Sequence, residues 1–449
     1  MPLTVLTDAD VQEVLFSLTR EDILDLQQSL GDALHYYSTS NEDNGCCSSY
    51  QPLRTSLKRS DGRTTLFMPA SSEDRLGMKV VTLQAPEDSK IANVDRLSLS
   101  SSQQSQSPRG SVSTISSSSS ATVPQPSSSI LSSDSTTPRG SLSIFSPDGT
   151  PIALINAEEL TAFRTALASC AMLKKRHSVH DVTVFGAGKQ AYWHVRIAML
   201  LRGDDIHHVN IINRSFDRAR DMLIRLYHPR PDDPDYVNPI GHKYGSKTKT
   251  AIITPSHAEY TRLLKEYVRS ANVIFCTTPS TEPLFPASYL TNPEGRKKGR
   301  YIACVGSYKP HMIELHPDIV KQAVAPHHEH RHFHKHQKEG GAVIVDSVEA
   351  CLQEAGEVIQ AKLQPHEVVE LGELIMLRRE AEKKANEGGF QDGDMAGLQL
   401  QETSGLHQWL TKGNVIYKSV GLGLMDVVVG SELVRLARQR GIGTTIPDF

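Results

Sequence analysis

One segment constrains the fold of this chain more than any other: a glycine-rich turn between an apolar strand and a helix. Residues 181–185 read DVTVF, and residues 186–191 follow as GAGKQA, with the spacing GxGxxA. The first glycine permits a tight turn, the second lets backbone approach a pyrophosphate, and Ala191 lets the helix pack on the strand. The pattern predicts a dinucleotide site formed by Gly186, Gly188, Lys189, Gln190 and Ala191. The alternative is a small-residue turn that binds no ligand.

Short apolar runs alternate with helical patterns through the middle of the chain. After the helix that ends near residue 202, strands are expected at 209–213, 251–253, 273–277, 301–305 and 342–346. Such apolar strands are typically buried on both faces, and their alternation with helices favours parallel pairing. The expected fold class is therefore α/β, with a doubly wound parallel sheet in a nucleotide-binding domain over residues 174–347.

The preceding residues have a different pattern, which predicts an α+β unit. A helix pair is expected over 8–36 and a further helix over 157–175. Strands are expected at 64–70, 77–83, 142–145 and 152–155.

Three segments have compositions that oppose a packed structure. Twenty of the fifty residues from 101 to 150 are serine, so the segment 86–136 is expected to be disordered. Residues 326–340 are rich in histidine, but they lack a catalytic metal spacing such as HExxH. We expect a solvated loop there and assign no metal ligands. Residues 383–412, rich in Glu, Gly and Gln, are also expected to form a loop.

Charge and apolar content exclude several classes of partner. The 48 basic and 51 acidic residues give a net charge of −3 without a basic stripe, so nucleic-acid binding is not expected. No run approaches the ~20 apolar residues that span a bilayer, and the first residues lack a secretory pattern. Six cysteines without a CxxC pair indicate no disulfide framework. We therefore expect a cytoplasmic protein without membrane partners.

The end of the second expected strand indicates which dinucleotide is bound. NAD sites usually carry Asp or Glu there, whereas this chain has Asn213, Arg214 and Ser215. Arg214 can pair with a ribose phosphate and Ser215 can donate a hydrogen bond. Charge-assisted bonds of ~1.5–3 kcal/mol each are enough to set a preference. The pattern favours NADP(H) over NAD(H); the alternative is a solvated arginine at the start of a helix.

Several short motifs, taken in order, resemble the ornithine cyclodeaminase/μ-crystallin family. They are residues 164–169 (RTALAS), 186–191 (GAGKQA), 276–280 (CTTPS), 305–310 (VGSYKP), 346–347 (DS) and 418–421 (KSVG). Each motif is modest alone, but the ordered set is specific. Outside the inserts, the resemblance covers most of residues 51–85 and 137–449.

The resemblance implies a Rossmann domain inserted into a discontinuous α+β domain that binds substrate and forms a homodimer. That second domain would comprise residues 1–85, 137–173 and 348–449. The matching motifs imply further cofactor contacts, which are Thr137, Thr277, Thr278, Pro279, Val305, Ser307 and Ser419.

Members of this family act on small amino or imino acids, and three cations match the positions that meet the substrate carboxylate. These are Arg54, Lys79 and Arg164. Independently, a buried carboxylate needs cationic partners, and a forked guanidinium fits it with two hydrogen bonds. Each residue has an alternative interpretation: Arg54 on the surface, Lys79 on the exposed side of a strand, and Arg164 paired with a core carboxylate.

One departure from the family pattern bears on the reaction. The resemblance implies an acid in cyclodeaminases where this chain has Tyr308, and an aromatic residue there is similar to the ketimine-reducing members. We therefore expect an NADPH-dependent reductase of small cyclic or linear 2-imino acids, with Tyr308 in the site and Lys79 affecting imine protonation. The alternatives are an ornithine cyclodeaminase with a substituted base and a non-catalytic protein that binds NADPH and a small ligand.

Overall fold

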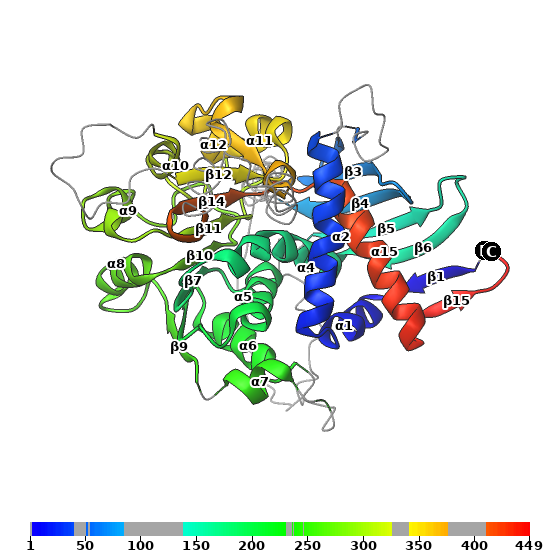
Figure 1. Cartoon of the computed structure of the whole chain (residues 1–449), viewed down its shortest axis with the longest axis horizontal. Coiled ribbons are helices and arrows are strands. Elements are labelled where there is room, and N and C mark those ends of the chain that lie inside the picture. Colours follow the sequence, from blue (N-terminus) through cyan, green and yellow to red (C-terminus); the bar gives the residue numbers. More distant parts are fainter. Residues whose placement is uncertain are drawn as a thin grey trace, which may run out of the picture.

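The computed structural model describes residues 2–39, 51–52, 54–84, 138–229, 236, 238–245, 247–325, 341–375 and 410–449. The segments 86–136 and 326–340 and most of 383–412 lie outside these residues, so their expected lack of packed structure remains a prediction. The described chain forms two sheets, with helix α4 (Ala157–Ser169) between them (Figure 1).

The first sheet has seven strands in the order β15-β1-β6-β5-β4-β3-β2. Its strands are β1 (Leu3–Leu6), β2 (Thr55–Lys58), β3 (Arg63–Ser71), β4 (Leu76–Gln84), β5 (Arg139–Phe145), β6 (Pro151–Asn156) and β15 (Thr444–Ile446). Only β1 and β6 pair in parallel among these neighbours in the described chain. On β4, Gly77, Lys79 and Val81 are buried and Met78 is exposed, because successive side chains point to opposite faces.

Helices cover the buried face of this sheet (Figure 1). They are α1 (Asp8–Phe16), α2 (Arg20–Thr39) and α15 (Gly423–Arg440). Thr7 and Asp10 form a capping box that fixes the start of α1. Helix α15 lies against α2 and across β3, β4 and β5, so residues close to the C-terminus pack on strands from the first third of the chain.

The second sheet has eight strands in the order β13-β12-β14-β11-β10-β7-β8-β9. These are β7 (Asp181–Phe185), β8 (His208–Ile212), β9 (Lys249–Ile253), β10 (Val273–Cys276), β11 (Tyr301–Cys304), β12 (Gly341–Val345), β13 (Val368–Glu370) and β14 (Asn414–Lys418). All neighbouring pairs among these described strands are parallel. The chain runs from β7 outward to β9 and then returns to β10 on the other side, which makes a topological switch point between β7 and β10. The predicted α/β fold class is confirmed.

Helices lie on both faces of this parallel sheet, as a doubly wound fold requires. They are α5 (Lys189–Arg202), α6 (Phe216–Tyr227), α7 (Pro239–Tyr244), α8 (Tyr260–Ser270), α9 (Ser288–Thr291), α10 (Pro317–Val324), α11 (Val348–Glu354) and α12 (Gly356–Ala361). Short 3-10 turns lie at Cys170–Lys175, Gly295–Lys297 and Pro365–Glu367. The first of these continues α4, so the helix expected over 157–175 changes its winding at Cys170.

The parallel sheet extends past residue 347, the expected end of the nucleotide-binding domain. Strand β13 pairs with β12, and β14 lies between β11 and β12. The physical reason is that residues 414–418 are an apolar segment whose backbone bonds are completed by two open neighbouring strands. The final segment of the chain therefore contributes to both sheets, through β14 and then through α15 and β15.

Candidate active site

The glycine-rich turn after β7 has the conformation that its spacing predicts. Gly186 has φ of +106°, a region that favours glycine, and a Cβ there would lie 2.8 Å from Oγ1 of Thr277. Gly188 precedes α5 as its N-cap, supplies no side-chain cap and has open space where a Cβ would stand. The first backbone N–H groups of α5 therefore face a space that glycine leaves free. Such a cradle fits a pyrophosphate.

The ends of β10 and β11 lie beside this turn. Thr277 donates its hydroxyl to the carbonyl of Phe185 (2.7 Å), and Thr278 packs against Gly186. The backbone N–H of Val305 donates to Cys276 (3.1 Å). Pro279 follows Thr278 and is half-buried. The structure thus brings the strand-end residues expected from the family motifs to the same edge as the glycine-rich turn.

The end of β8 presents Arg214 to solvent. Asn213 donates its side-chain amide to the carbonyl of Ser215 (2.7 Å), and Ser215 caps α6 by accepting from the N–H of Arg218 (3.3 Å). Arg214 is exposed and has no ion pair among the described residues. Asn213 and Ser215 therefore shape the turn, and Arg214 is the one residue of the three with its side chain available to an anion.

Lys189 has a different position from the one that its motif suggests. Its ammonium lies 2.6 Å from Oε2 of Glu159, 3.0 Å from Glu158 and 3.9 Å from Asp8. Glu159 is fully buried and also accepts from the indole of Trp193 (2.8 Å). The Lys189 side chain thus joins the start of α5 to α1 and α4, and only its backbone remains for a phosphate.

The other two residues of the motif differ in exposure. Gln190 is half-buried, and its carbonyl pairs with Nδ1 of His194 at 2.7 Å. Ala191 is fully buried, as expected for a residue that lets α5 pack against its strand.

A second cluster forms where β4 meets α15. Nζ of Lys79 lies 2.8 Å from Oδ1 of Asp426, and Nε of Arg164 lies 3.1 Å from the same oxygen. All three side chains are buried. Lys79 is therefore not on the exposed side of its strand. Arg164 pairs with a core carboxylate, as its alternative interpretation expected. That carboxylate, Asp426, binds Lys79 as well as Arg164.

Arg54 reaches the same region from the start of β2. It pairs with the carboxylate of Glu354, with 2.8 Å between Nε and Oε1, and its NH1 lies 3.4 Å from the carbonyl of Val420. The guanidinium of Arg164 packs against the next residue, Gly421. Arg54 and Arg164 therefore meet the same turn after β14, and Arg54 is largely buried rather than on the surface.

Asp346, at the end of β12, holds that turn in place. Its carboxylate accepts from the hydroxyl of Ser419 (2.6 Å) and from the N–H groups of Val420 (3.3 Å) and Gly421 (2.7 Å). Gly421 has φ of +91°, so glycine suits the turn. The Ser419 hydroxyl donates its hydrogen bond to Asp346. Ser419 is therefore associated with the expected cofactor region only because it follows the carboxyl end of β14.

Burial and neighbouring charges set the proton affinity of Lys79. Burial lowers its pKa from 10.5 to about 8, with the charges of Arg164 and Arg54 acting in the same direction and that of Asp426 opposing them. Arg164 and Arg54 lower the pKa of Lys79 because their positive charges lie close to its ammonium. A lysine in this state is charged at neutral pH and can release a proton slightly above it.

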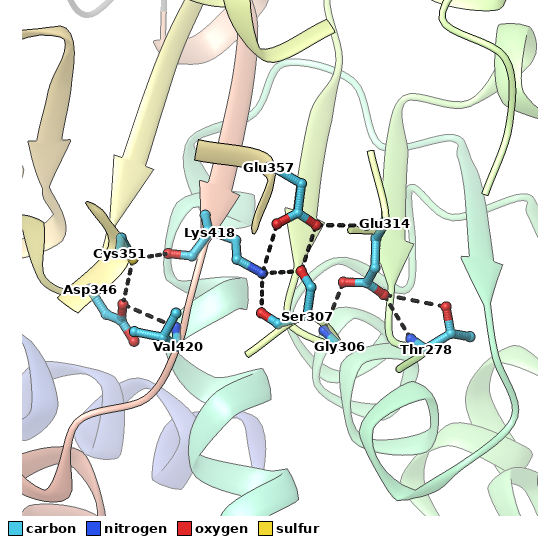
Figure 2. A network of polar contacts seen from close by, with 9 residues as sticks. All are labelled: Thr278, Gly306, Ser307, Glu314, Asp346, Cys351, Glu357, Lys418 and Val420. Atoms are coloured by element: carbon cyan, nitrogen blue, oxygen red, sulfur yellow. Dashed lines mark hydrogen bonds and ion pairs between the residues drawn. The ribbon is translucent and has the colours of Figure 1, made fainter. Parts of the chain in front are cut away.

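Figure 2 shows a third polar network, beneath the loops that follow β10 and β11. Glu314 accepts from the backbone N–H groups of Thr278 and Gly306, each at 2.7 Å. Glu357 accepts from the N–H of Glu314 (2.7 Å) and from the hydroxyl of Ser307. Lys418 donates to Ser307 and lies 3.4 Å from Glu357. Ser307 is thus fully buried in this network, which contains no exposed acid or base.

The remaining expected residues have the following places. Tyr308 is half-buried and follows Ser307 in the loop after β11. Thr137 lies outside the described residues, as does the histidine-rich run. Within the described ranges no group of three or more His, Cys, Asp or Glu side chains could hold a metal ion. No helix in that part of the chain is long and apolar enough to cross a membrane.

Sequence reasoning missed the acidic members of these clusters, which are Glu314, Asp346 (noted only as part of a motif), Glu354, Glu357 and Asp426. Buried charges are rare unless paired, and their partners are distant in sequence. The available signal was Asp426 itself, an acid within the apolar helical run 423–437.

Comparisons with known proteins place these features in context. No family model matches the chain. A Delta(1)-pyrroline-2-carboxylate reductase of Bacillus cereus is 25% identical over 405 residues, covering 88% of each chain. The ketimine reductase mu-crystallin of Rattus norvegicus is 26% identical over 240 residues, covering 53% of this chain and 59% of that protein. The resemblance to the ornithine cyclodeaminase/μ-crystallin family is confirmed.

The fold of this chain is also similar to that of a solved structure. The Delta(1)-pyrroline-2-carboxylate reductase of Thermococcus litoralis, in complex with NADH and L-proline, superposes with a TM-score of 0.59 at 17% identity. The match covers 98% of this chain and 99% of that one. The arrangement of the two sheets in Figure 1 is therefore shared with that structure, and the glycine-rich turn lies at the switch point of the parallel sheet.

Proposed function

We propose that the protein is an NAD(P)H-dependent oxidoreductase that reduces small 2-imino acids, cyclic or linear. One observation carries this proposal: Arg54 and Arg164 contact the turn after β14, and Lys79 shares the carboxylate of Asp426 with Arg164. Since all strands of that sheet are parallel, this turn lies at the same edge as the glycine-rich turn. Cations for a carboxylate and a cradle for a dinucleotide thus lie at one edge of the same sheet. The names of the relatives, a pyrroline-2-carboxylate reductase and a ketimine reductase, support the same reaction class.

The dinucleotide would lie on Gly186, Gly188 and the start of α5, with its reactive end toward Thr277, Thr278 and the loop of Tyr308. When bound, it supplies a hydride. The described site residues supply orientation and a proton. The guanidinium groups of Arg54 and Arg164 fix the substrate carboxylate, and the Lys79 ammonium protonates the imine nitrogen, which makes its carbon more electrophilic.

Arg214 favours NADP(H) over NAD(H) in this proposal. It is exposed at the end of β8, where a ribose 2′-phosphate would lie, and no Asp or Glu stands at 213–215 to repel that phosphate. Asn213 and Ser215 keep the turn that presents it.

The outer face of the seven-stranded sheet fits a homodimer. Met78, Ser143 and Leu154 lie side by side across β4, β5 and β6, and Met78 and Leu154 remain exposed. Leu76 is exposed on the same face. An apolar sheet face of this kind is typical of a subunit contact, and a second copy of the chain would cover it.

One observation favours a second candidate, a protein that binds NADPH and a small ligand without turnover. Each cation of the substrate region already has a carboxylate partner, Glu354 for Arg54 and Asp426 for Lys79 and Arg164. A substrate carboxylate would share these cations with resident acids. By contrast, Tyr308 in place of an acid disfavours cyclodeamination.

Loss of NADPH absorbance with a panel of cyclic ketimine carboxylates tests the proposal, with NADH in parallel. Turnover of a ketimine supports the reductase. Tight dinucleotide binding without turnover over imines, amino acids and ornithine supports the binding protein, and formation of proline and ammonia from ornithine supports the cyclodeaminase.

A further inference from the structure

Glu314 joins the two loops on which the proposed cofactor site depends. Its Oε1 accepts the N–H of Thr278, in the loop after β10, and its Oε2 accepts the N–H of Gly306, in the loop after β11 (Figure 2). The loops are packed closely, since a Cβ on Gly306 would lie 2.2 Å from the carbonyl oxygen of Thr278. One carboxylate thus sets the spacing between them.

The surroundings of this carboxylate make its charge costly. Glu314 is fully buried, and Glu357 of α12 faces it with a second carboxylate. Lys418 of β14 is a buried cation 3.4 Å from Glu357 whose charge also acts on Glu314, and Cys276 and Cys304 lie in the neighbouring strands β10 and β11. Burial raises the pKa of Glu314 from 4.5 to about 7, with Glu357 adding to the rise and Lys418 and the two N–H bonds opposing it.

Protonation would weaken the bridge between the loops. An ionised carboxylate accepts hydrogen bonds at both oxygens, whereas a protonated one becomes a donor at one of them. The closest contacts of Glu314 on the loops are the two N–H donors, and Oε1 also accepts from the Thr278 hydroxyl at the longer distance of 3.4 Å. A proton on either oxygen competes with the N–H bond to that oxygen, so the bridged arrangement of the loops favours the ionised form.

We propose that Glu314 is a positioning residue for the dinucleotide, and that binding of the dinucleotide releases a proton from this buried carboxylate. The inference rests on the proposed function, because it places the dinucleotide on the loops of Thr278 and Gly306. The bound dinucleotide favours the bridged loops, and the bridged loops favour the ionised form of Glu314. If part of the free protein carries a proton on Glu314, binding must therefore release that proton.

Calorimetric titration of the full chain in buffers of different ionisation enthalpy tests this proposal. NADH is the probe, because the 2′-phosphate of NADPH itself titrates near pH 6. We expect release of a fraction of a proton at pH 7 and none at pH 9, where Glu314 is already ionised. In Glu314→Gln, the release disappears and binding weakens by about tenfold, since the amide can accept only one of the two N–H bonds.

Three further variants identify the source of the proton. Glu282→Gln, which changes an exposed glutamate in the same loop region, keeps the wild-type proton number. So does Lys79→Met, which removes a second buried group, one whose pKa is about 8. Glu314→Asp keeps a carboxylate and partly restores the release. Proton release that survives in Glu314→Gln would overturn the inference.

The wild-type protein alone also decides the inference, even if the variants fail to fold. Dinucleotide binding with no buffer dependence at pH 7 would overturn it and leave the proposed function intact. Absence of dinucleotide binding at every pH would overturn the proposed function and this inference with it.

Discussion

Lys79 and Asp426 are 347 residues apart in sequence, and their side chains form a buried ion pair with 2.8 Å between Nζ and Oδ1. Strand β4 supplies the lysine and helix α15 the aspartate. Through this pair, the Asp426 carboxylate of α15 raises the pKa of Lys79, the proton donor of the proposed reaction.

The rate of imine reduction is expected to depend on this pair. Below its pKa of about 8, Lys79 is charged and can protonate the imine; above it, the donor is lost. We therefore expect kcat/KM to fall as pH rises through about 8. In Asp426→Asn, the charge that raises this pKa is absent, so the fall begins at lower pH. Identical profiles for the two proteins would contradict the assignment, provided that circular dichroism shows that the variant folds.

The two glycines of the turn after β7 should respond differently to alanine. In Gly186→Ala, the positive φ and the close Thr277 hydroxyl strain the turn, so we expect a loss of about 1–3 kcal/mol in the free energy of unfolding. In Gly188→Ala, the added methyl meets open space, so unfolding is nearly unchanged while dinucleotide affinity falls at least tenfold. Denaturant unfolding and fluorescence titration measure the two effects separately. Unchanged affinity in Gly188→Ala would argue against a pyrophosphate there.

Arg214→Ala tests the cofactor preference. Loss of a charge-assisted bond of ~1.5–3 kcal/mol weakens NADPH binding by about 10- to 150-fold and changes NADH binding little. Arg218→Ala is the matched control, because Arg218 is an exposed arginine in the first turn of α6, which follows Arg214. Equal losses for both dinucleotides would remove Arg214 from the phosphate site.

Arg164→Lys tests the carboxylate site. The substitution keeps the charge beside Asp426 but removes the planar fork, so we expect KM for the imino acid to rise about tenfold with a smaller change in kcat. Steady-state kinetics measure both constants, and Arg435→Lys, on the exposed face of α15, provides the control. A wild-type KM in Arg164→Lys would indicate that this arginine only supports the core.

Leu154→Glu tests the dimer. A charge on the outer face of the seven-stranded sheet opposes burial against a second copy, so sedimentation should show monomers. Ile224→Glu, at an equally apolar exposed position on α6, should leave the assembly unchanged. Monomeric wild-type protein at micromolar concentration would exclude the proposed interface.

Local patterns in the sequence predicted much of this fold. The glycine-rich turn, the apolar strands and the helix carrying Arg164 were all predicted because their signals are local in sequence. Strand β14 was missed because its five residues follow a polar segment and are too few to give a clear strand pattern. Their strand conformation depends on pairing with β11 and β12. The carboxylates Glu314 and Asp426 were missed for a related reason, because their partners come from other parts of the chain. Without a visible partner, an acidic residue in a sequence is expected to be exposed.

The position of β14 has a consequence for synthesis of the chain on the ribosome. Strands β11 and β12 are made well before residues 414–418, and each lacks its inner neighbour until then. The nascent protein therefore presents two unpaired strand edges in the middle of its largest sheet, where intermolecular pairing is most damaging. A premature stop before Asn414 would yield an aggregation-prone product rather than a smaller enzyme.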